Sequence, residues 1–202
     1  MARPSNPEIR AKLKEQAIDY VLTHGLAALS LRPLAKALNT NARMLVYHFG
    51  SREGLMREIL AGLREREDAR IRVWFRRGKK PRTLSDFLRW YWRRLSARQA
   101  RPAALLIFEL YALALREPQA HPAVLSDPLT YWQSLAARAG VNTKSNDAEA
   151  TLLLAATRGL LLDLAATNER ARVTRAVSLL AGLLESAVVS HRRRRTATSI
   201  AR

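Results

Sequence analysis

The chain has 202 residues, enough to bury a substantial core, and 48% of them are apolar, which excludes a disordered or fibrous protein. It contains no cysteine, and its four histidines are not spaced as metal ligands, so disulfides, thiolate chemistry and a dedicated metal site are not expected. No window reaches the roughly 18 uninterrupted apolar residues of a membrane span, and no apolar signal peptide is recognisable, so we expect a cytoplasmic protein.

The formal net charge of +18 is distributed unevenly. Residues 61–100 carry 13 Lys and Arg against 4 Asp and Glu, and residues 191–202 carry 5 against none, whereas residues 101–190 are balanced. This asymmetry indicates a polyanionic partner, nucleic acid first and an anionic membrane surface second. The alternative is a solvated arginine-rich surface, and the roles of the basic segment 64–98 and of the arginine run 192–195 stay open.

The first predicted helix covers residues 7–23. Asn6, Pro7 and Glu8 are typical of a helix start, because they supply a capping side chain, a proline at the first position and an acid near the positive end of the helix dipole. Apolar residues then recur every four positions, which predicts one amphipathic helix that Gly25 ends.

Two short helices are predicted next. Ser30 caps the first of them, and Asn39 stands where a left-handed residue is needed to end it. Asn41 caps a helix over residues 42–49, and Ser51 begins a fourth helix. Three helices in under fifty residues, with a short turn between the last two, are the arrangement of a helix-turn-helix.

The second half of the chain is also predicted to be helical, and no strand alternation of useful length occurs, so the fold class is all-α. The expected helices cover residues 84–98, 102–116, 122–139, 147–167 and 169–190. The helix over residues 147–167 is apolar around most of its circumference, so it must be covered on several sides.

The run SLRPLAKALNTNARMLVYHFGSREGLMREIL resembles the N-terminal DNA-binding segment of the TetR family of transcriptional regulators. The resemblance covers about residues 9–60 and includes the cap, the alanine at the helix crossing, the His-Phe pair and the Ser-basic restart, in the order of the family pattern. Three positions depart from it: Asn39 replaces the turn glycine, Thr40 replaces an apolar residue, and Val46 replaces a tyrosine, with Tyr47 one residue later.

The resemblance implies a division of the chain and a set of DNA contacts. It implies a helix-turn-helix domain over residues 1–58 with the motif at about 30–49, a helical effector-binding and dimerisation domain over residues 59–191, and a basic tail, 192–202, that we expect to be mobile. Arg43 is the side chain that can bind guanine through two hydrogen bonds. The expected DNA-binding residues are Ser30, Arg32, Asn41, Ala42, Arg43, Met44, Tyr47, His48 and Arg52.

Some of these residues have a purely structural alternative. Arg43 and Arg52, taken singly, also suit a solvated surface, and His48 also suits the capping of a helix end. We expect Tyr47, His48 and Arg52 to hold phosphates, with Tyr47 taking over the role of the family tyrosine. Leu45 and Phe49 are expected in the core.

Aromatic and ionisable side chains in the second half suggest a small-molecule pocket of the kind that the family generally carries. A buried charge is costly unless it is paired, so Glu109 and Arg158 form either a structural ion pair or the polar end of that pocket. The expected ligand-binding residues are Trp90, Phe108, Glu109, Tyr111, Trp132 and Arg158.

These patterns favour a transcriptional repressor that a small molecule releases from a palindromic operator. A homodimer through residues about 147–190 would place two reading heads on double-stranded DNA. The alternative is a basic helical protein that binds an anionic membrane surface, or nucleic acid without sequence preference. We expect no cofactor and no enzymatic activity, because the sequence shows no nucleophile-base pair, phosphate loop or carboxylate pair at meaningful spacing. The operator, the effector and the choice between repression and activation are not encoded in any recognisable pattern.

Overall fold

The computed structural model describes residues 6–26, 29–77, 80–117, 128–141 and 147–200. In these ranges the chain is all-α and contains no β-strand, as the sequence predicts. Two compact units can be distinguished. Unit 1 comprises Met1–Gly78 with Leu105–Leu113, and unit 2 comprises Lys79–Ala104 with Ala114–Arg202.

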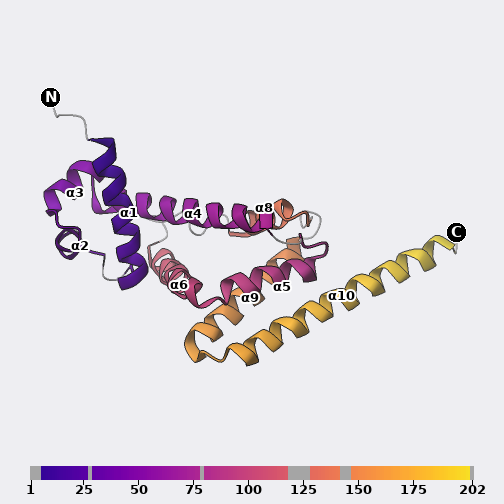
Figure 1. The fold of residues 1–202 in the computed structure, drawn as a ribbon. Coiled ribbons are helices and arrows are strands. Elements are labelled where there is room, and N and C mark those ends of the chain that lie inside the picture. The colour runs from indigo at the N-terminus through magenta and orange to yellow at the C-terminus, as the bar shows by residue number, and fades with distance from the viewer. Residues whose placement is uncertain (1–5, 27–28, 78–79, 118–127, 142–146, 201–202) are drawn as a thin grey trace. The chain divides into compact units, whose positions relative to one another are not determined.

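Unit 1 is built from four helices in chain order, α1 (Pro7–His24), α2 (Leu31–Ala37), α3 (Ala42–Phe49) and α4 (Arg52–Arg77), together with part of α6 (Arg101–Arg116). In Figure 1, α1, α2 and α3 lie together, and α4 continues from α3. Their apolar faces form one core, into which α6 inserts Leu106. The least exposed large side chains of this core are Ile18, Leu29, Leu34, Leu45, Leu55 and Ile59.

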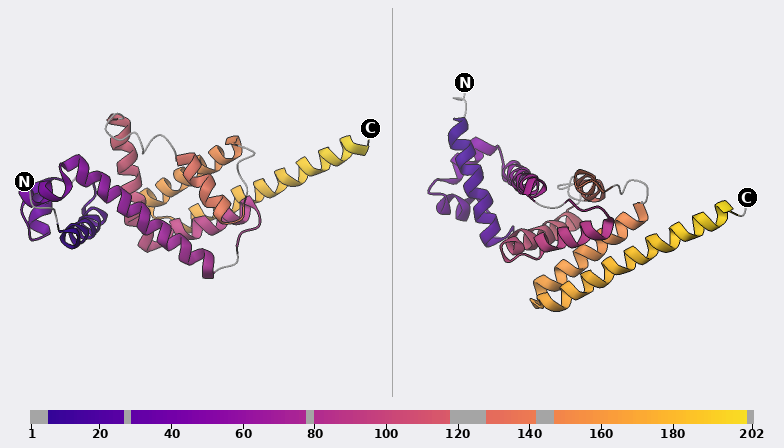
Figure 2. Two further views of the ribbon diagram at one scale, coloured as in Figure 1. Left: turned by 90° about the horizontal axis from the view of Figure 1, so that it is seen from above. Right: turned by 45° about the vertical axis from the view of Figure 1, so that its right-hand side comes forward.

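Unit 2 contains α5 (Leu84–Leu95), a short 3-10 helix η1 (Arg98–Ala100), α8 (Pro128–Arg138), α9 (Asp147–Thr167) and α10 (Arg170–Ile200). α10 packs along α5 and α9, and α8 packs on α9. Figure 2 shows α9 and α10 as a hairpin, with the last part of α10 extending beyond its neighbours. Buried apolar side chains of α5, α8, α9 and α10 form the core of this unit, among them Phe87, Leu88, Trp132, Leu135, Leu153 and Val173.

The predicted helix starts are confirmed where a capping side chain was expected, with one difference. The Asn6 side chain accepts a hydrogen bond from the Glu8 amide at 3.0 Å, and the Asn41 side chain accepts one from the Met44 amide at 2.9 Å. Ser30 does occupy the N-cap of α2, but its side chain makes no capping hydrogen bond. The local start signals are therefore a good guide to the helix boundaries in unit 1.

The helix ends in unit 2 differ more from the prediction. α5 ends at Leu95, not at residue 98, because the chain turns there into η1. α10 continues to Ile200, past the predicted end at residue 190, so residues 192–200 of the tail expected to be mobile are helical, and residues 201–202 lie outside the described residues. No glycine or proline occurs after Gly182 to stop that helix. Residues 122–127 of the helix predicted over 122–139 lie outside the described residues.

The division into units also differs from the expected boundary after residue 58. α4 lies wholly in unit 1, and residues 105–113 of α6 belong to that unit as well. α6 is therefore the one helix among the described elements whose residues are shared by both units.

α9 is an apolar helix that leaves much of its apolar surface exposed in a single copy of the chain. Within the described residues it alone is long and apolar enough to cross a membrane, judged by length and composition, with a mean hydropathy of 1.4 over its most apolar window. Only 28% of that window is buried. A helix whose free face is covered by a partner chain has the same composition, and the expectation that α9 is covered on several sides is not met within one copy of the chain.

Candidate nucleic-acid interface

The turn between α2 and α3 is closed by backbone hydrogen bonds that depend on Asn39. Asn39 adopts a positive φ of 51°, which reverses the chain after α2. Its amide donates to the Lys36 carbonyl at 3.2 Å, and the Thr40 amide donates to the Ala35 carbonyl at 2.9 Å. This pair of bonds is a Schellman motif, in which asparagine substitutes for glycine. The sequence departure at Asn39 therefore preserves the turn.

The first turn of α3 presents polar atoms to solvent. Asn41 and Arg43 are exposed, whereas Ala42 and Met44 are half-buried. Because the Asn41 side chain satisfies the Met44 amide, α3 begins sharply at this point. The first turn of a recognition helix is the part that a helix-turn-helix directs at base edges.

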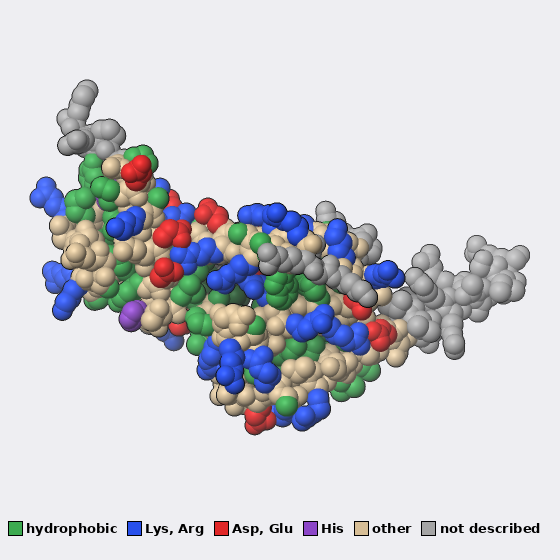
Figure 3. All heavy atoms as spheres, in the orientation of Figure 1, with side chains coloured by type: hydrophobic (Ala, Val, Ile, Leu, Met, Phe, Trp, Pro, Cys, Tyr) green, Lys and Arg blue, Asp and Glu red, His purple; other side chains and the backbone are tan. Residues whose placement is uncertain are grey.

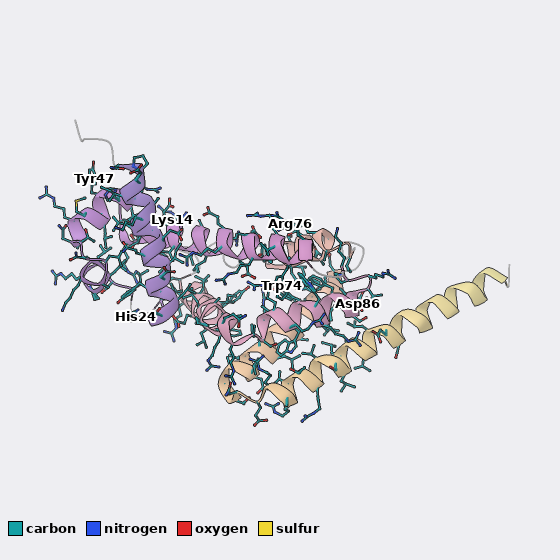
Figure 4. The ribbon with its side chains drawn as sticks, viewed as in Figure 1. Lys14, His24, Tyr47, Trp74, Arg76 and Asp86 are labelled. Atoms are coloured by element: carbon teal, nitrogen blue, oxygen red, sulfur yellow. The ribbon has the colours of Figure 1, made fainter. Side chains whose placement is uncertain are left out.

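One face of α3 carries the exposed side chains and the opposite face carries the core. Leu45 and Phe49 are buried, as predicted. Arg43 and Tyr47 are four residues apart, so they lie on the same side of the helix, and Val46 lies beside them. Tyr47 is 43% exposed and Val46 is 41% exposed. Figure 4 labels Tyr47 on α3.

Val46 is a further residue that could contact DNA. From the sequence it was identified only as the replacement of a tyrosine in the family pattern. Its exposure next to Arg43 makes it able to meet an apolar group such as a thymine methyl. Its position three residues after Arg43 could have predicted this, because residues three apart lie on the same face of a helix.

His48 is buried, with 7% of its surface exposed, although it was expected to hold a phosphate. Among the described residues neither of its ring nitrogens has a hydrogen-bond partner. Its ring instead packs edge-on against Tyr47, with centroids 5.1 Å apart. A phosphate contact by this side chain would require the ring to rotate outward, so in this conformation His48 supports the packing of α3.

Arg10 holds α1 against α3 and α4. Its Nε donates to the His48 carbonyl at 3.2 Å, and its Nη2 donates to Glu58 Oε1 at 2.6 Å. The guanidinium also lies 5.5 Å from the centre of the Phe49 ring, close enough for a cation-π interaction. Lys14 adds a second cation 3.5 Å from Glu58.

These two cations change the acidity of Glu58. Partial burial raises the pKa of the carboxyl, but the hydrogen bonds and charges of Arg10 and Lys14 outweigh that effect and leave the pKa below its ordinary value. Glu58 therefore stays ionised at neutral pH and keeps α1 and α4 tied together.

The remaining predicted phosphate contacts lie around the start of α2 and α4. Ser30 and Arg32 are exposed at the start of α2. Arg52 is exposed at the start of α4, and its Nε donates to the Leu29 carbonyl at 3.1 Å. This bond fixes Arg52 beside the segment that leads into α2. An arginine held by one nitrogen retains further N–H groups for a phosphate.

The residues expected to line a ligand pocket are divided between the units. Phe108, Glu109 and Tyr111 are half-buried in unit 1, whereas Trp90, Trp132 and Arg158 belong to unit 2. Glu109 Oε2 accepts a hydrogen bond from the Leu26 amide at 2.5 Å, at the turn that follows α1.

The aromatic side chains of unit 2 pack on one another. The Trp132 ring meets Phe87 edge-on at 5.3 Å, and Trp90 stacks on Phe87 at 5.8 Å. Trp90 and Trp132 are buried. In the described ranges no group of three or more His, Asp or Glu side chains is placed to hold a metal ion.

The comparisons with known proteins agree with this geometry. The family model described as bacterial regulatory proteins, tetR family, matches residues 15–59. A search of curated proteins finds no match.

Several solved structures have a similar fold. A transcriptional regulator from Rhodococcus sp. Rha1 is 20% identical, with a TM-score of 0.66 over 88% of this chain and 96% of that one. The multidrug binding protein EbrR, complexed with imidazole, is 25% identical, with a TM-score of 0.62 over 87% and 90%. GusR from Salmonella enterica is 21% identical, with a TM-score of 0.57 over 91% and 100%.

Proposed function

We propose that this chain is a DNA-binding transcriptional regulator of the TetR type, which represses transcription as a homodimer on a palindromic operator and is released by a small molecule. The observation that carries the proposal is the α2–α3 unit. Its closed turn and capped start aim the first turn of α3, with Arg43, out of the core. Such a protein would act in the cytoplasm, where its operator lies.

We assign base reading to the first turn of α3 and phosphate binding to its surroundings. Asn41, Ala42, Arg43 and Met44 face the bases, and Val46 joins them. Ser30, Arg32, Tyr47 and Arg52 hold the backbone, because exposed hydroxyl and guanidinium groups suit phosphate oxygens. His48 contributes only if its ring turns outward.

Dimerisation is supported by exposed leucines on α9 and α10. Leu152 and Leu162 of α9 are 60% and 52% exposed, and Leu179 and Leu183 of α10 are 67% and 60% exposed. An added Cβ at Gly159 would meet no atom of the described residues within 4 Å, so another helix can approach closely there. These residues lie in the segment 147–190 that we expect to join two copies, and two copies double the length of operator that is read.

The proposed release by a small molecule is supported by the resemblance to the TetR family and by one protein of similar structure. EbrR is described as a multidrug binding protein. We propose by analogy that an apolar compound binds this chain near some of Trp90, Phe108, Glu109, Tyr111, Trp132 and Arg158. Because these residues are divided between the two units, the analogy with EbrR extends to the class of ligand and not to the individual contacts.

Selection of bound sequences from random duplexes tests the proposal. We expect a palindrome whose half-sites are centred about one or more helical turns, roughly 34–36 Å each, apart. Selected sequences without two-fold symmetry, or equal binding to all duplexes, would contradict it. Binding to anionic vesicles but not to DNA would favour the membrane-surface alternative.

A further inference from the structure

We propose that a cavity at the turn between α9 and α10 binds a small organic anion, whose apolar body enters the cavity and whose carboxylate or phosphate meets arginines at the rim. The cavity has a volume of about 260 Å³ and lies wholly within unit 2. It is formed where the α5–η1–α6 connection meets the end of α9 and the start of α10. This proposal does not depend on operator binding.

The floor of the cavity is apolar and its rim is cationic. Leu95, Leu161 and Leu164 supply apolar surface, and Arg98, Arg101 and Arg170 are the charged residues that line it. Among the described residues that line it, none is acidic. Figure 3 shows Lys and Arg side chains gathered over the end of unit 2 at which α9 turns into α10.

No described residue neutralises the three arginines. None of Arg98, Arg101 and Arg170 forms an ion pair within the ranges that the structure describes. The acids nearest to the turn are engaged elsewhere, because Arg172 binds Asp163 at 2.7 Å and Glu169 at 2.5 Å. The hydrogen bond from Arg172 also holds the pKa of Asp163 below its ordinary value, so this acid stays committed to its partner.

An amphipathic anion matches both parts of the cavity. A guanidinium binds a carboxylate or a phosphate through two parallel hydrogen bonds, which a hydroxyl or an amine cannot reproduce. The leucine and alanine atoms that line the cavity gain when an apolar ligand removes their remaining accessible surface from water. The volume lies just below the range of about 300–1,000 Å³ for drug-sized ligands, so a medium-chain carboxylate or phosphate ester fits better than a large drug.

The cavity and the proposed dimer surface use different faces of α9. At about 100° per residue, Leu161 and Leu164 lie on the side of α9 that also carries the buried Leu153. Leu152 and Leu162 lie on the exposed side. A second copy that covers the exposed leucines therefore leaves the cavity lining in place.

Calorimetry on the full-length protein without DNA tests the proposal, with octanoate, octyl phosphate and octanol as probes. We expect saturable binding of both anions, and weaker binding of octanol by about tenfold or more. Octanol bound as tightly as octanoate, or no saturable binding of either anion below about 5 mM, would overturn the proposal.

Variants locate the site. R98Q/R101Q removes two rim charges and should weaken octanoate binding by about tenfold or more. Arg175→Gln removes an exposed arginine of α10 that does not line the cavity, and should change binding by less than about twofold. Ala165→Trp should block the cavity and abolish binding, with helix content unchanged by circular dichroism. Equal effects of R98Q/R101Q and Arg175→Gln would show non-specific attraction and sink the site. Because DNA is absent, failure here leaves the operator proposal untouched.

Discussion

Arg43 is the side chain on the exposed face of α3 that can donate two parallel hydrogen bonds to a guanine edge. Replacing it with alanine should remove about 1–3 kcal/mol of discrimination at one base position in each half-site, while the rest of the preferred sequence persists. Sequence selection with the variant measures this directly. Arg57→Ala removes an exposed arginine from α4 and serves as the control, for which the sequence preference should not change. An unaltered preference in Arg43→Ala would remove Arg43 from base reading.

Tyr47 is expected to bind a phosphate in place of the tyrosine that Val46 replaces. Tyr47→Phe keeps the ring that packs on His48 and removes only the hydroxyl. It should weaken binding by about 1 kcal/mol on every operator variant, because a phosphate contact carries no base information. Fluorescence anisotropy on a set of operator variants measures both features. A loss confined to one base pair would mean that Tyr47 reads bases.

Residue roles in unit 1 were predictable where they depend on neighbours in sequence. Asn39 and Asn41 were assigned correctly, because a turn and a cap involve atoms within a few residues. The burial of His48 was not predicted as such; in the structure Tyr47 packs edge-on against its ring, and Arg10, 38 residues away, donates to its backbone carbonyl. The contact between Glu109 and the Leu26 amide spans 83 residues and left no local signal.

At the scale of elements, the turn after α1 is where Glu109 of α6 bonds to the rest of unit 1. Gly25 adopts φ 79° and ψ 171°, a conformation that favours glycine, and a Cβ there would lie 2.8 Å from a Glu109 carboxylate oxygen. Gly25→Ala should lower the free energy of unfolding by about 1–3 kcal/mol through backbone strain, plus a further loss when Glu109 is displaced from Leu26. Denaturant titration measures the total.

Two further variants separate the loss caused by backbone strain at Gly25 from the loss caused by displacing Glu109. Gly140 also has a positive φ, 91°, but a Cβ there would meet no atom of the described residues within 4 Å, so Gly140→Ala reports strain without a contact from that part of the chain. If Glu109 is displaced, Gly25→Ala in a Glu109→Ala background should cost less than in the wild type, as a double-mutant cycle shows. Equal costs in both backgrounds would mean that Glu109 does not feel the added methyl group.

The contact between α1 and α4 should depend on pH through Glu58. Because Arg10 and Lys14 lower the pKa of Glu58 from 4.5 in the folded state, its ion pairs stabilise the fold above about pH 4.5, and this contribution is lost as the pH falls through the lowered value. Glu58→Gln should therefore cost up to about 1 kcal/mol at pH 7 and almost nothing near pH 3. Denaturant titrations at both pH values measure the difference.

A matched glutamate controls for charge in this experiment. Glu117→Gln neutralises an exposed glutamate that forms no ion pair in the described part of the chain, and it should show no comparable dependence on pH. A Glu58→Gln cost that is the same at pH 7 and pH 3 would assign the effect to packing instead of charge.

Helix starts and helix ends were not equally predictable. α9 was predicted with both of its bounds, because Asp147 begins a long apolar run and left-handed Asn168, φ 59°, ends it. α5 was predicted three residues too long, since the turn into η1 is stabilised by backbone bonds such as Ala100 to Ala97 that no special residue announces. α10 was predicted too short, because a run of arginines was taken for a coil although it contains no helix breaker.

At the scale of the whole molecule, the charge and the apolar surface are complementary features of one regulator. On the proposed function, we expect the +18 charge to supply attraction to DNA that does not depend on sequence, and a few contacts on α3 to supply specificity. The balanced charge of residues 101–190 suits a segment that associates with its own copy, where a high net charge would be repulsive. Sequence periodicity indicated these helices, but only the structure shows which leucines a single copy leaves exposed.

The exposed leucines of α10 should decide the oligomeric state. L179E/L183E places two carboxylates on each copy at positions where burial of a leucine is worth about 1.5–3 kcal/mol, so the dimer should dissociate by more than about a hundredfold. Light scattering should give a monomer with normal helix content, and the monomer should bind a half-site but not the palindrome cooperatively. Leu115→Glu alters a leucine of α6 that is 71% exposed and should leave the dimer intact. A dimer that persists in L179E/L183E would move the interface away from this face of α10.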